Sequence, residues 1–249
     1  GSKPRFTVPN TLANPLLTGG TRSEFEIGTD FNFLSNRIGF ELTYFDRVDK
    51  DLPIAIPVPG STGYSGLSIN SGESSTAGLE FTLNASPVRN ADFRWDVSLN
   101  LATLKKTTDK LYEGINTRIL DNMSWYSLQL QEKVGEEWGT FVGRKPKMTA
   151  DGTPIYTANG RTAYEGNQVL GNILPDYTGG FSTSFGYKNW NLDAGIDFQA
   201  GGMFYSVSNM FAYYSGQHED TVGNNDKGNP KRDAVSDGGG VHVVGVTEA

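Results

Sequence analysis

The chain has 249 residues, enough for one large or two small domains, and carries 21 Lys and Arg against 28 Asp and Glu for a net charge of -7. That balance argues against a nucleic-acid-binding protein that works by neutralising phosphates. Zero cysteines exclude disulfides and thiolate metal sites. No apolar run approaches the roughly 20 residues that a membrane helix needs, so a membrane role would have to use strands.

The first predicted element is a hairpin over residues 22–46, which contains the stretch "EFEIGTDFNFLSNRIGFELTY". Before "LSNR" the apolar side chains stand at odd positions, and after it they stand at even positions. The apolar set is Phe25, Ile27, Phe31, Phe33, Ile38, Phe40, Leu42 and Tyr44. Alternation with period two predicts strands that have one apolar and one polar face.

Two more hairpins are predicted over residues 76–104 and 176–203, with "SPVRNA" and "KN" as their turns. Both repeat the alternation on each side of the turn, as in "DFRWDVSLNLA". We expect the three hairpins to be antiparallel neighbours in one sheet. One face of that sheet should then carry Phe31, Leu42, Phe81, Leu99, Phe185 and Ile196.

The connections alternate between short and long. Turns within the hairpins take a handful of residues, whereas residues 47–75, 105–172 and 204–249 form long loops between or after them. Compact domains usually have connections of about 4–6 residues, while outer-membrane barrels combine short periplasmic turns with long extracellular loops. The pattern predicts an all-β fold, in which antiparallel hairpins form part of a large transmembrane outer-membrane β-barrel with its apolar face on lipid.

A soluble or cell-surface β-sandwich, for example a carbohydrate-binding module, is the alternative, because its strands also alternate. Sandwich strands are usually nearer 5–6 residues, and nothing in that fold gathers the long loops at one end. Aromatic residues near the short turns also suit the interfacial girdle of a barrel. These residues are Phe33, Phe93, Trp95, Tyr187 and Trp190.

Three sequence blocks carry short motifs in a fixed order. "RSEFEIGTDFNFLSNRIGFELTYFDR" holds Glu-x-Gly-x-Asp, an Asn-Arg turn and a Tyr-rich return strand. "INSGESSTAGLEFTLNASPVRNADFRWDVSLNLA" holds Asn-x-Gly-Glu, Gly-x-Glu and Phe-x-Trp-Asp, and "VLGNILPDYTGG" holds Gly-Asn-x-x-Pro-Asp. Together these blocks resemble the SusC/RagA family of TonB-linked outer-membrane transporters from Bacteroidetes. The resemblance covers most of residues 20–104 and 169–205 and little of the long loops.

The resemblance implies a transporter and not an enzyme. Such a protein has a barrel of about 22 strands closed by an internal plug, on which the TonB complex pulls through the N-terminal region. The predicted hairpins match only the late part of such a barrel, and single-chain bacterial barrels need at least about 8 strands. We therefore expect a fragment of the C-terminal part of the barrel, located in the outer membrane, with the plug and N-terminal domains absent.

The implied partners are a SusD-like lipoprotein, which covers the extracellular face as a lid, and a nutrient, either an oligosaccharide or a peptide. Four aromatic residues of the longest loop are candidate contacts, since aromatic rings stack on sugars and anchor protein interfaces. They are Trp125, Tyr126, Trp138 and Tyr164. Contact with the lid is favoured over direct contact with the ligand, and burial within the folded loop is favoured over both.

No catalytic constellation, cofactor site or metal site is predicted. The two histidines, His218 and His242, have no Ser or Cys partner at a recognisable spacing. "HED" at 218–220 lacks a second group of metal ligands, and "NNDKGN" at 224–229 lacks the acidic pattern of a calcium loop. Acidic residues expected on the lumen face could pair with plug arginines, line a path for cargo or simply solvate the interior, and solvation of the interior is favoured. They are Glu24, Glu26, Asp30, Glu41, Glu80 and Asp96.

Overall fold

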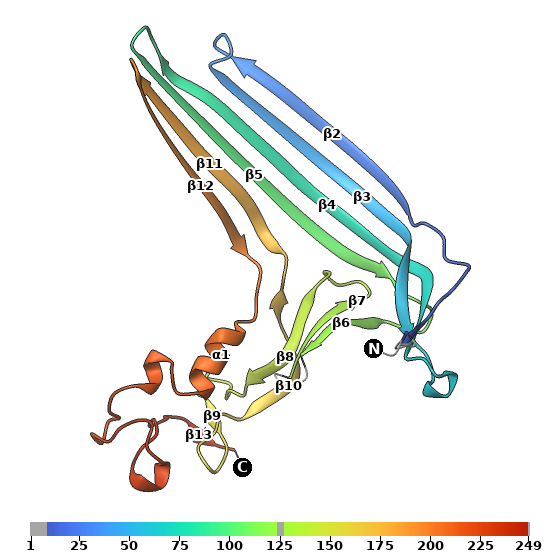
Figure 1. The fold of residues 1–249 in the computed structure, drawn as a ribbon, viewed down its shortest axis with the longest axis vertical. Helices are drawn as coiled ribbons and strands as arrows, with labels where there is room; N and C mark the ends of the chain where they lie inside the picture. The colour runs from blue at the N-terminus through green and yellow to red at the C-terminus, as the bar shows by residue number, and fades with distance from the viewer. Residues whose placement is uncertain (1–8, 124–126, 249) are drawn as a thin grey trace, which may run out of the picture. The chain divides into compact units, whose positions relative to one another are not determined.

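The computed structural model describes residues 9–123 and 127–248, and most of these residues lie in strands (Figure 1). The chain divides into two compact units. The first unit comprises Gly1–Met123, Gln129–Phe141 and Gly171–Met203. The second unit comprises Ser124–Leu128, Val142–Leu170 and Phe204–Ala249.

The first unit is built on one long antiparallel sheet. Its strands are β2 (Thr21–Phe33), β3 (Ile38–Pro57), β4 (Gly66–Arg89), β5 (Phe93–Lys110), β11 (Pro175–Tyr187) and β12 (Trp190–Gly201). In the described part of the chain the order is β12-β11-β5-β4-β3-β2, and the short β1 (Thr11–Leu12) pairs with β4 as a seventh, parallel strand. The expected all-β fold of antiparallel hairpins is therefore confirmed, and we call this element the long sheet.

The short turns gather at one end of the long sheet, the upper end in Figure 1. Residues 34–37, 90–92 and 188–189 make these turns, and we call this end the turn end and the opposite one the connection end. The first turn is unusual because Leu34, Ser35 and Asn36 all have positive φ, at 51, 57 and 62°. Backbone of this kind turns the chain sharply and ends both strands at the same level.

The segment 47–75, expected to be a loop, is mostly strand. β3 continues to Pro57 and β4 starts at Gly66, which leaves only residues 58–65 as a connection. A bulge between Asp49 and Leu52 hides the continued alternation, with Asp51 at a φ of 55°. The 24 residues of β4 would extend about 80 Å at about 3.3 Å per residue, whereas about 9–11 tilted residues cross a bilayer.

The segment 105–172 is folded rather than an open loop. After the end of β5 it forms β6 (Thr117–Met123), β7 (Leu128–Lys133), β8 (Thr140–Pro146), β9 (Ile155–Tyr156) and β10 (Tyr164–Asn172). Within the described residues, a four-stranded sheet has the order β10-β8-β7-β6, and β9 pairs with β13 (Val246–Thr247).

The segment after β12 contains one short helix, α1 (Val207–Tyr214), and the 3-10 turns η3 (Glu219–Thr221) and η4 (Val235–Asp237). Ser206 caps α1 by accepting a hydrogen bond from the Asn209 backbone N–H at 3.1 Å. In the part of the chain that the structure describes, no helix is both long and apolar enough to cross a membrane.

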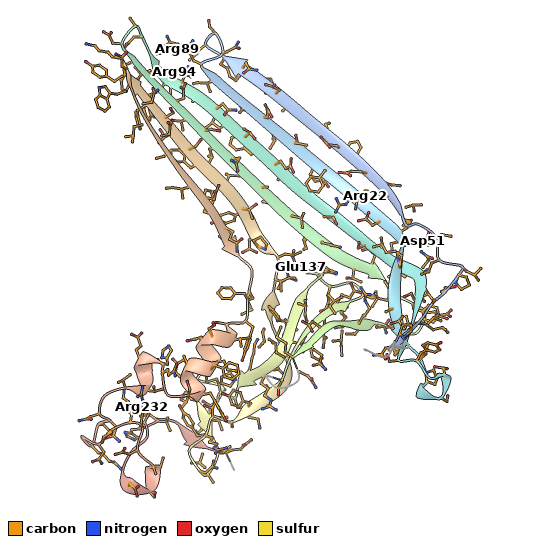
Figure 2. All side chains as sticks on the ribbon, in the orientation of Figure 1. Arg22, Asp51, Arg89, Arg94, Glu137 and Arg232 are labelled. Carbon is orange, nitrogen blue, oxygen red and sulfur yellow. The ribbon has the colours of Figure 1, made fainter. Side chains whose placement is uncertain are left out.

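At its C-terminal end, β5 pairs with residues 136–138 of the first unit instead of with β11. Pairing between β11 and β5 stops at Thr178 and Ala102. Beyond that point the Trp138 N–H donates to the Lys106 carbonyl at 2.8 Å, and the Thr108 N–H donates to the Glu136 carbonyl at 3.1 Å. Figure 2 shows Glu137 beside this end of the strand, where it forms a bridge with Thr107. These bonds satisfy backbone groups that would otherwise be open at an edge.

Candidate functional site

One face of the long sheet is apolar from β2 to β12. Residues paired across neighbouring strands share a face, and the register links Phe31, Phe40, Leu83, Leu99, Phe181 and Ile196 in a row. Of the six residues expected on one face, Phe31, Leu99 and Ile196 belong to this row. Leu42, Phe81 and Phe185 stand two or four residues from Phe40, Leu83 and Phe181 along the same strands, so all six share the face. Ile27, Leu192 and Ile196 remain 60, 67 and 63% exposed. An exposed apolar face of this extent needs an apolar solvent or a partner.

Aromatic rings concentrate on this apolar face near the turn end. Phe31 lies 5.2 Å from Phe40 between ring centroids, and Trp95 stacks on Phe185 at 5.6 Å. Trp190 is 79% exposed at the β11–β12 turn. The indole N–H of Trp95 is satisfied, because it donates a hydrogen bond to a side-chain hydroxyl on the same face. Rings with such polar tips suit the boundary between hydrocarbon and water.

The opposite face of the long sheet is polar and carries a buried charge. Asp49 is 5% exposed; its Oδ1 lies 2.7 Å from the Arg22 Nε, and its Oδ2 lies 3.5 Å from the Arg47 Nε. Arg22, labelled in Figure 2, stands opposite Asp49 in the β2–β3 register. The sequence reasoning missed this cluster because it placed residues 47–75 in a loop. The signal was there, since Arg47 and Asp49 continue the odd-numbered polar positions of β3.

A pocket of about 370 Å³ lies at the turn end of the polar face. There Asp96 accepts a hydrogen bond from the Ser86 hydroxyl at 2.6 Å and pairs with the Arg94 Nε at 2.5 Å. Asp30 stands directly opposite Glu41, a pairing of like charges that is unfavourable unless a counter-charge lies nearby. The face is therefore suited to water or to cationic groups. All of the acids expected on the lumen face lie on it: Glu24, Glu26, Asp30, Glu41, Glu80 and Asp96.

The four candidate contact residues have different settings. Trp125 and Tyr126 lie outside the described residues. Trp138 belongs to the first unit, where it is half-buried and where the Lys106 ammonium lies 4.8 Å from its ring centroid. Tyr164 belongs to the second unit and is 51% exposed. Trp138 therefore helps to hold a folded segment, while Tyr164 offers an accessible ring.

The histidines of the second unit lie in local polar clusters. The Tyr213 ring stacks on His218 at 3.9 Å, and its hydroxyl donates to Asp220 Oδ2 at 2.5 Å, which raises the pKa of Tyr213 above its usual 10.0. His242 lies 2.9 Å from Asp226. Among the described residues, no group of three or more His, Cys, Asp or Glu is placed to hold a metal ion.

Known proteins of similar sequence agree with this geometry. No family model matches the sequence. TonB-dependent receptor P3 of Formosa agariphila is 26% identical over 218 residues, which cover 78% of this chain and 22% of that protein. TonB-dependent receptor SusC of Bacteroides thetaiotaomicron is 26% identical over 185 residues, or 66% of this chain and 18% of SusC. The chain is similar in sequence to TonB-dependent receptors, SusC among them.

TonB-dependent receptors are outer-membrane β-barrel proteins, and the relatives named here are such receptors rather than enzymes. This chain spans about a fifth of the length of the curated receptors that it matches. The fold agrees with a solved RagAB peptide importer in the closed-closed state, with a TM-score of 0.60 and 21% identity over 76% of this chain and 22% of that one. The apolar and polar faces of the long sheet thus correspond to a segment of barrel wall.

Proposed function

We propose that the chain forms part of the barrel wall of an outer-membrane TonB-dependent receptor that actively imports a nutrient. The observation that carries this proposal is the two-faced long sheet, apolar and exposed on one side and polar on the other. Strands in hydrocarbon must satisfy their backbone groups by pairing and present apolar side chains to lipid. A sandwich would instead need a second layer on the apolar face, where Ile27, Leu192 and Ile196 are more than half exposed.

In this proposal the turn end faces the periplasm and the connection end faces the outside of the cell. The membrane-crossing hairpins are those over residues 22–46, 76–104 and 176–203. Residues 47–75, 105–172 and 204–249 lie on the extracellular side, partly as strands that continue beyond the bilayer. The length of β3 and β4 supports this arrangement, because neither strand fits within a bilayer. The plug and the N-terminal domains belong to other parts of the receptor.

The proposed partners are a SusD-like lipoprotein lid outside the cell and the TonB complex, reached through the N-terminal region of the receptor. The nutrient is an oligosaccharide or a peptide. Support comes from the likeness to SusC and to a solved peptide importer, RagAB. The exposed ring of Tyr164 is a suitable contact for the lid, and we assign Trp125 and Tyr126 to the same role.

The orientation can be tested by single cysteines, because the chain contains none. In the complete receptor made free of other cysteines, we would introduce Tyr164→Cys, Asn36→Cys or Ile196→Cys and label intact cells with a bulky water-soluble maleimide. Tyr164→Cys should react on intact cells, and Asn36→Cys only after the outer membrane is permeabilised. Ile196→Cys should react only with a lipid-soluble reagent. Labelling of all three sites on intact cells would exclude the proposed wall.

The import step needs its own measurement. Cells that express the receptor should accumulate the nutrient only when both TonB and the lid gene are present, and deletion of either should abolish accumulation. Uptake that persists without TonB would mean that the receptor acts as a passive pore and would contradict active import. Correct insertion with no uptake of any oligosaccharide or peptide would contradict the import proposal while keeping the barrel.

A further inference from the structure

A second pocket of the first unit, which we call the connection-end pocket, lies at the connection end of the polar face. Its volume is about 230 Å³, and strands β3 to β7 together with Trp138 contribute to its lining. It shares no lining residue with the pocket at the turn end. The charged residues of its lining are Glu73, Lys106, Lys110, Arg118 and Glu132.

Both carboxylates of the lining are already engaged by cations. The Arg118 Nε lies 2.5 Å from the Glu132 Oε1. The Glu73 Oε1 lies 3.4 Å from the ammonium group of Lys50, a residue outside the lining. The pocket therefore has no free carboxylate with which to hold a cationic ligand.

Two lysines of the lining have no carboxylate of their own. The Lys106 ammonium lies 4.8 Å from the centroid of the half-buried Trp138 ring. Lys110 is exposed and stands opposite Glu73 in the β4–β5 register, but Glu73 is bound to Lys50. Neither lysine forms an ion pair with any residue that the structure describes. Together with the two paired cations there are four cations for two carboxylates, so the pocket carries excess positive charge in a chain whose net charge is -7.

Two buried hydroxyls line the same pocket. Ser74 and Thr108 stand opposite each other in the β4–β5 register and are 4 and 2% exposed. Neither hydroxyl oxygen has a hydrogen-bond partner among the described residues. The hydroxyl of Thr76 is also unpaired but lies outside the pocket, so unpaired hydroxyls alone do not identify a ligand. Beside two ammonium groups without carboxylates, however, the two hydroxyls supply further hydrogen-bond donors for a ligand that accepts them.

We propose that the connection-end pocket binds one small oxyanion of the phosphate or sulfate type. Its oxygens would accept hydrogen bonds from the hydroxyls of Ser74 and Thr108 and from the ammonium groups of Lys106 and Lys110. A dianion would balance the excess positive charge, whereas a neutral or cationic ligand would leave it uncompensated. Since a water molecule takes about 30 Å³, the pocket also has room for water around the anion. This binding site goes beyond import, because a receptor that imports nothing would still hold the anion.

The test uses the purified complete receptor and inorganic phosphate as the probe. Binding is measured by isothermal titration calorimetry at constant ionic strength in a chloride background, and cryo-EM maps are recorded with and without phosphate. Phosphate should bind saturably and give the density of one separate tetrahedral anion between Ser74, Thr108 and Lys110. Sulfate should compete with phosphate for the site, and glycerol, a neutral probe, should not.

Thr108→Val and Lys110→Gln should each weaken phosphate binding about fivefold to tenfold, the effect of one lost hydrogen bond. The matched control for the hydroxyl is Thr76→Val, which removes an unpaired hydroxyl of similar burial outside the pocket. The matched control for the charge is Lys105→Gln, which removes an exposed lysine of the same strand outside the pocket. Both controls should bind phosphate as the parent does. The two valine variants keep the shape of the side chain and remove an unpaired polar group, so they should fold as well as the parent.

The absence of saturable phosphate binding, or density from ordered water alone at saturating phosphate, would overturn the proposal. A carboxylate from another part of the receptor in the pocket, or equal weakening of binding in the controls, would overturn it as well. Phosphate binding in a receptor that fails to import would leave this site standing and contradict only the proposed function. A receptor that imports its nutrient without binding phosphate would contradict only this site.

Discussion

The indole Nε1 of Trp95 donates a hydrogen bond of 2.9 Å to the hydroxyl of Thr183, across the β5–β11 pair. The Thr183 hydroxyl in turn donates to the Asp96 carbonyl at 3.3 Å. Both side chains lie on the apolar face, where lipid would offer no hydrogen bond in return. The two strands thus satisfy their polar side-chain groups within the sheet itself.

Replacing Thr183 with Val should leave the Trp95 N–H without a partner while conserving shape. We expect the free energy of unfolding of the complete receptor in lipid to fall by about 0.5–2 kcal/mol, the range found for interhelical bonds in membranes. Trp95→Phe combined with Thr183→Val should cost less than the sum of the single changes. Strict additivity in that double-mutant cycle would show that the bond contributes nothing in the membrane.

Charge should be tolerated differently on the two faces of the long sheet. Leu99→Arg or Ile196→Arg should destabilise the inserted receptor by about 2–4 kcal/mol if the site lies near the bilayer midplane. The matched changes Ser98→Arg and Ser184→Arg point to the polar face and should cost less. Folding yield and urea unfolding in vesicles measure the difference, and equal costs would refute the assignment of the faces.

The carboxylate of Asp49 should matter more than either of its arginines. Asp49→Asn leaves the half-buried Arg47 without its anion, and we expect a loss of about 1.5–3 kcal/mol in unfolding free energy, as for hydrogen bonds to charged groups. Arg22→Gln should cost much less, because the Arg22 side chain is 58% exposed and solvent screens its ion pair. The reverse order in denaturant unfolding would mean that Asp49 is held by something other than these arginines.

The Tyr213–Asp220 bond should make the second unit sensitive to alkali. Because the hydrogen bond to Asp220 raises the pKa of Tyr213 above 10.0, its contribution to stability is complete below pH 10.0 and is lost as the pH rises through the raised value. The ionisation of Tyr213 is measured as the difference between the ultraviolet pH titration of the parent receptor and that of the Tyr213→Phe variant. Asp220→Asn should bring its pKa down toward 10.0, and an unchanged titration would exclude the bond as the cause.

The two described aromatic candidates should separate a folding role from a contact role. Trp138→Ala should lower the stability of the receptor by about 1–3 kcal/mol, because the half-buried side chain packs within the first unit. Tyr164→Ala should leave stability unchanged and reduce recovery of the lid in co-purification. If Tyr164→Ala does not change the recovery of the lid, Tyr164 is not a lid contact, and the lid would have to bind other residues of the long connections.

The faces of the long sheet could be predicted because each strand meets two different solvents, so residues such as Leu99 and Ser98 alternate along the sequence. The positions at which the strands end could not be predicted from the sequence. At Asp51 a bulge shifts the alternation by a residue, and Pro53 inside β3 reads as a breaker although the pairing continues beyond it. The sequence therefore predicted a loop over residues 47–75, where β3 and β4 in fact continue.

The candidate site was only partly accessible to sequence reasoning. The lumen-facing acids follow from period two, but the partners of Asp49 depend on which strands become neighbours. The burial of Ser74 and Thr108 is harder still to predict, since a serine or threonine in a strand is ordinarily exposed or half-buried. Only the β4–β5 register shows that these two residues stand opposite each other, and only the folded chain shows that both are buried.

The bulges in β3 and β4 also bear on how such a wall can change its length. One inserted residue within an alternating run would send every later side chain to the opposite face, exchanging the lipid-facing set for the lumen-facing one. Insertions in pairs keep the faces, as do single ones absorbed at the bulges beside Asp49 and Ala85 or in residues 58–65. A bulge can therefore accommodate a single inserted or deleted residue, while the side chains in the rest of the strand keep the face on which they lie.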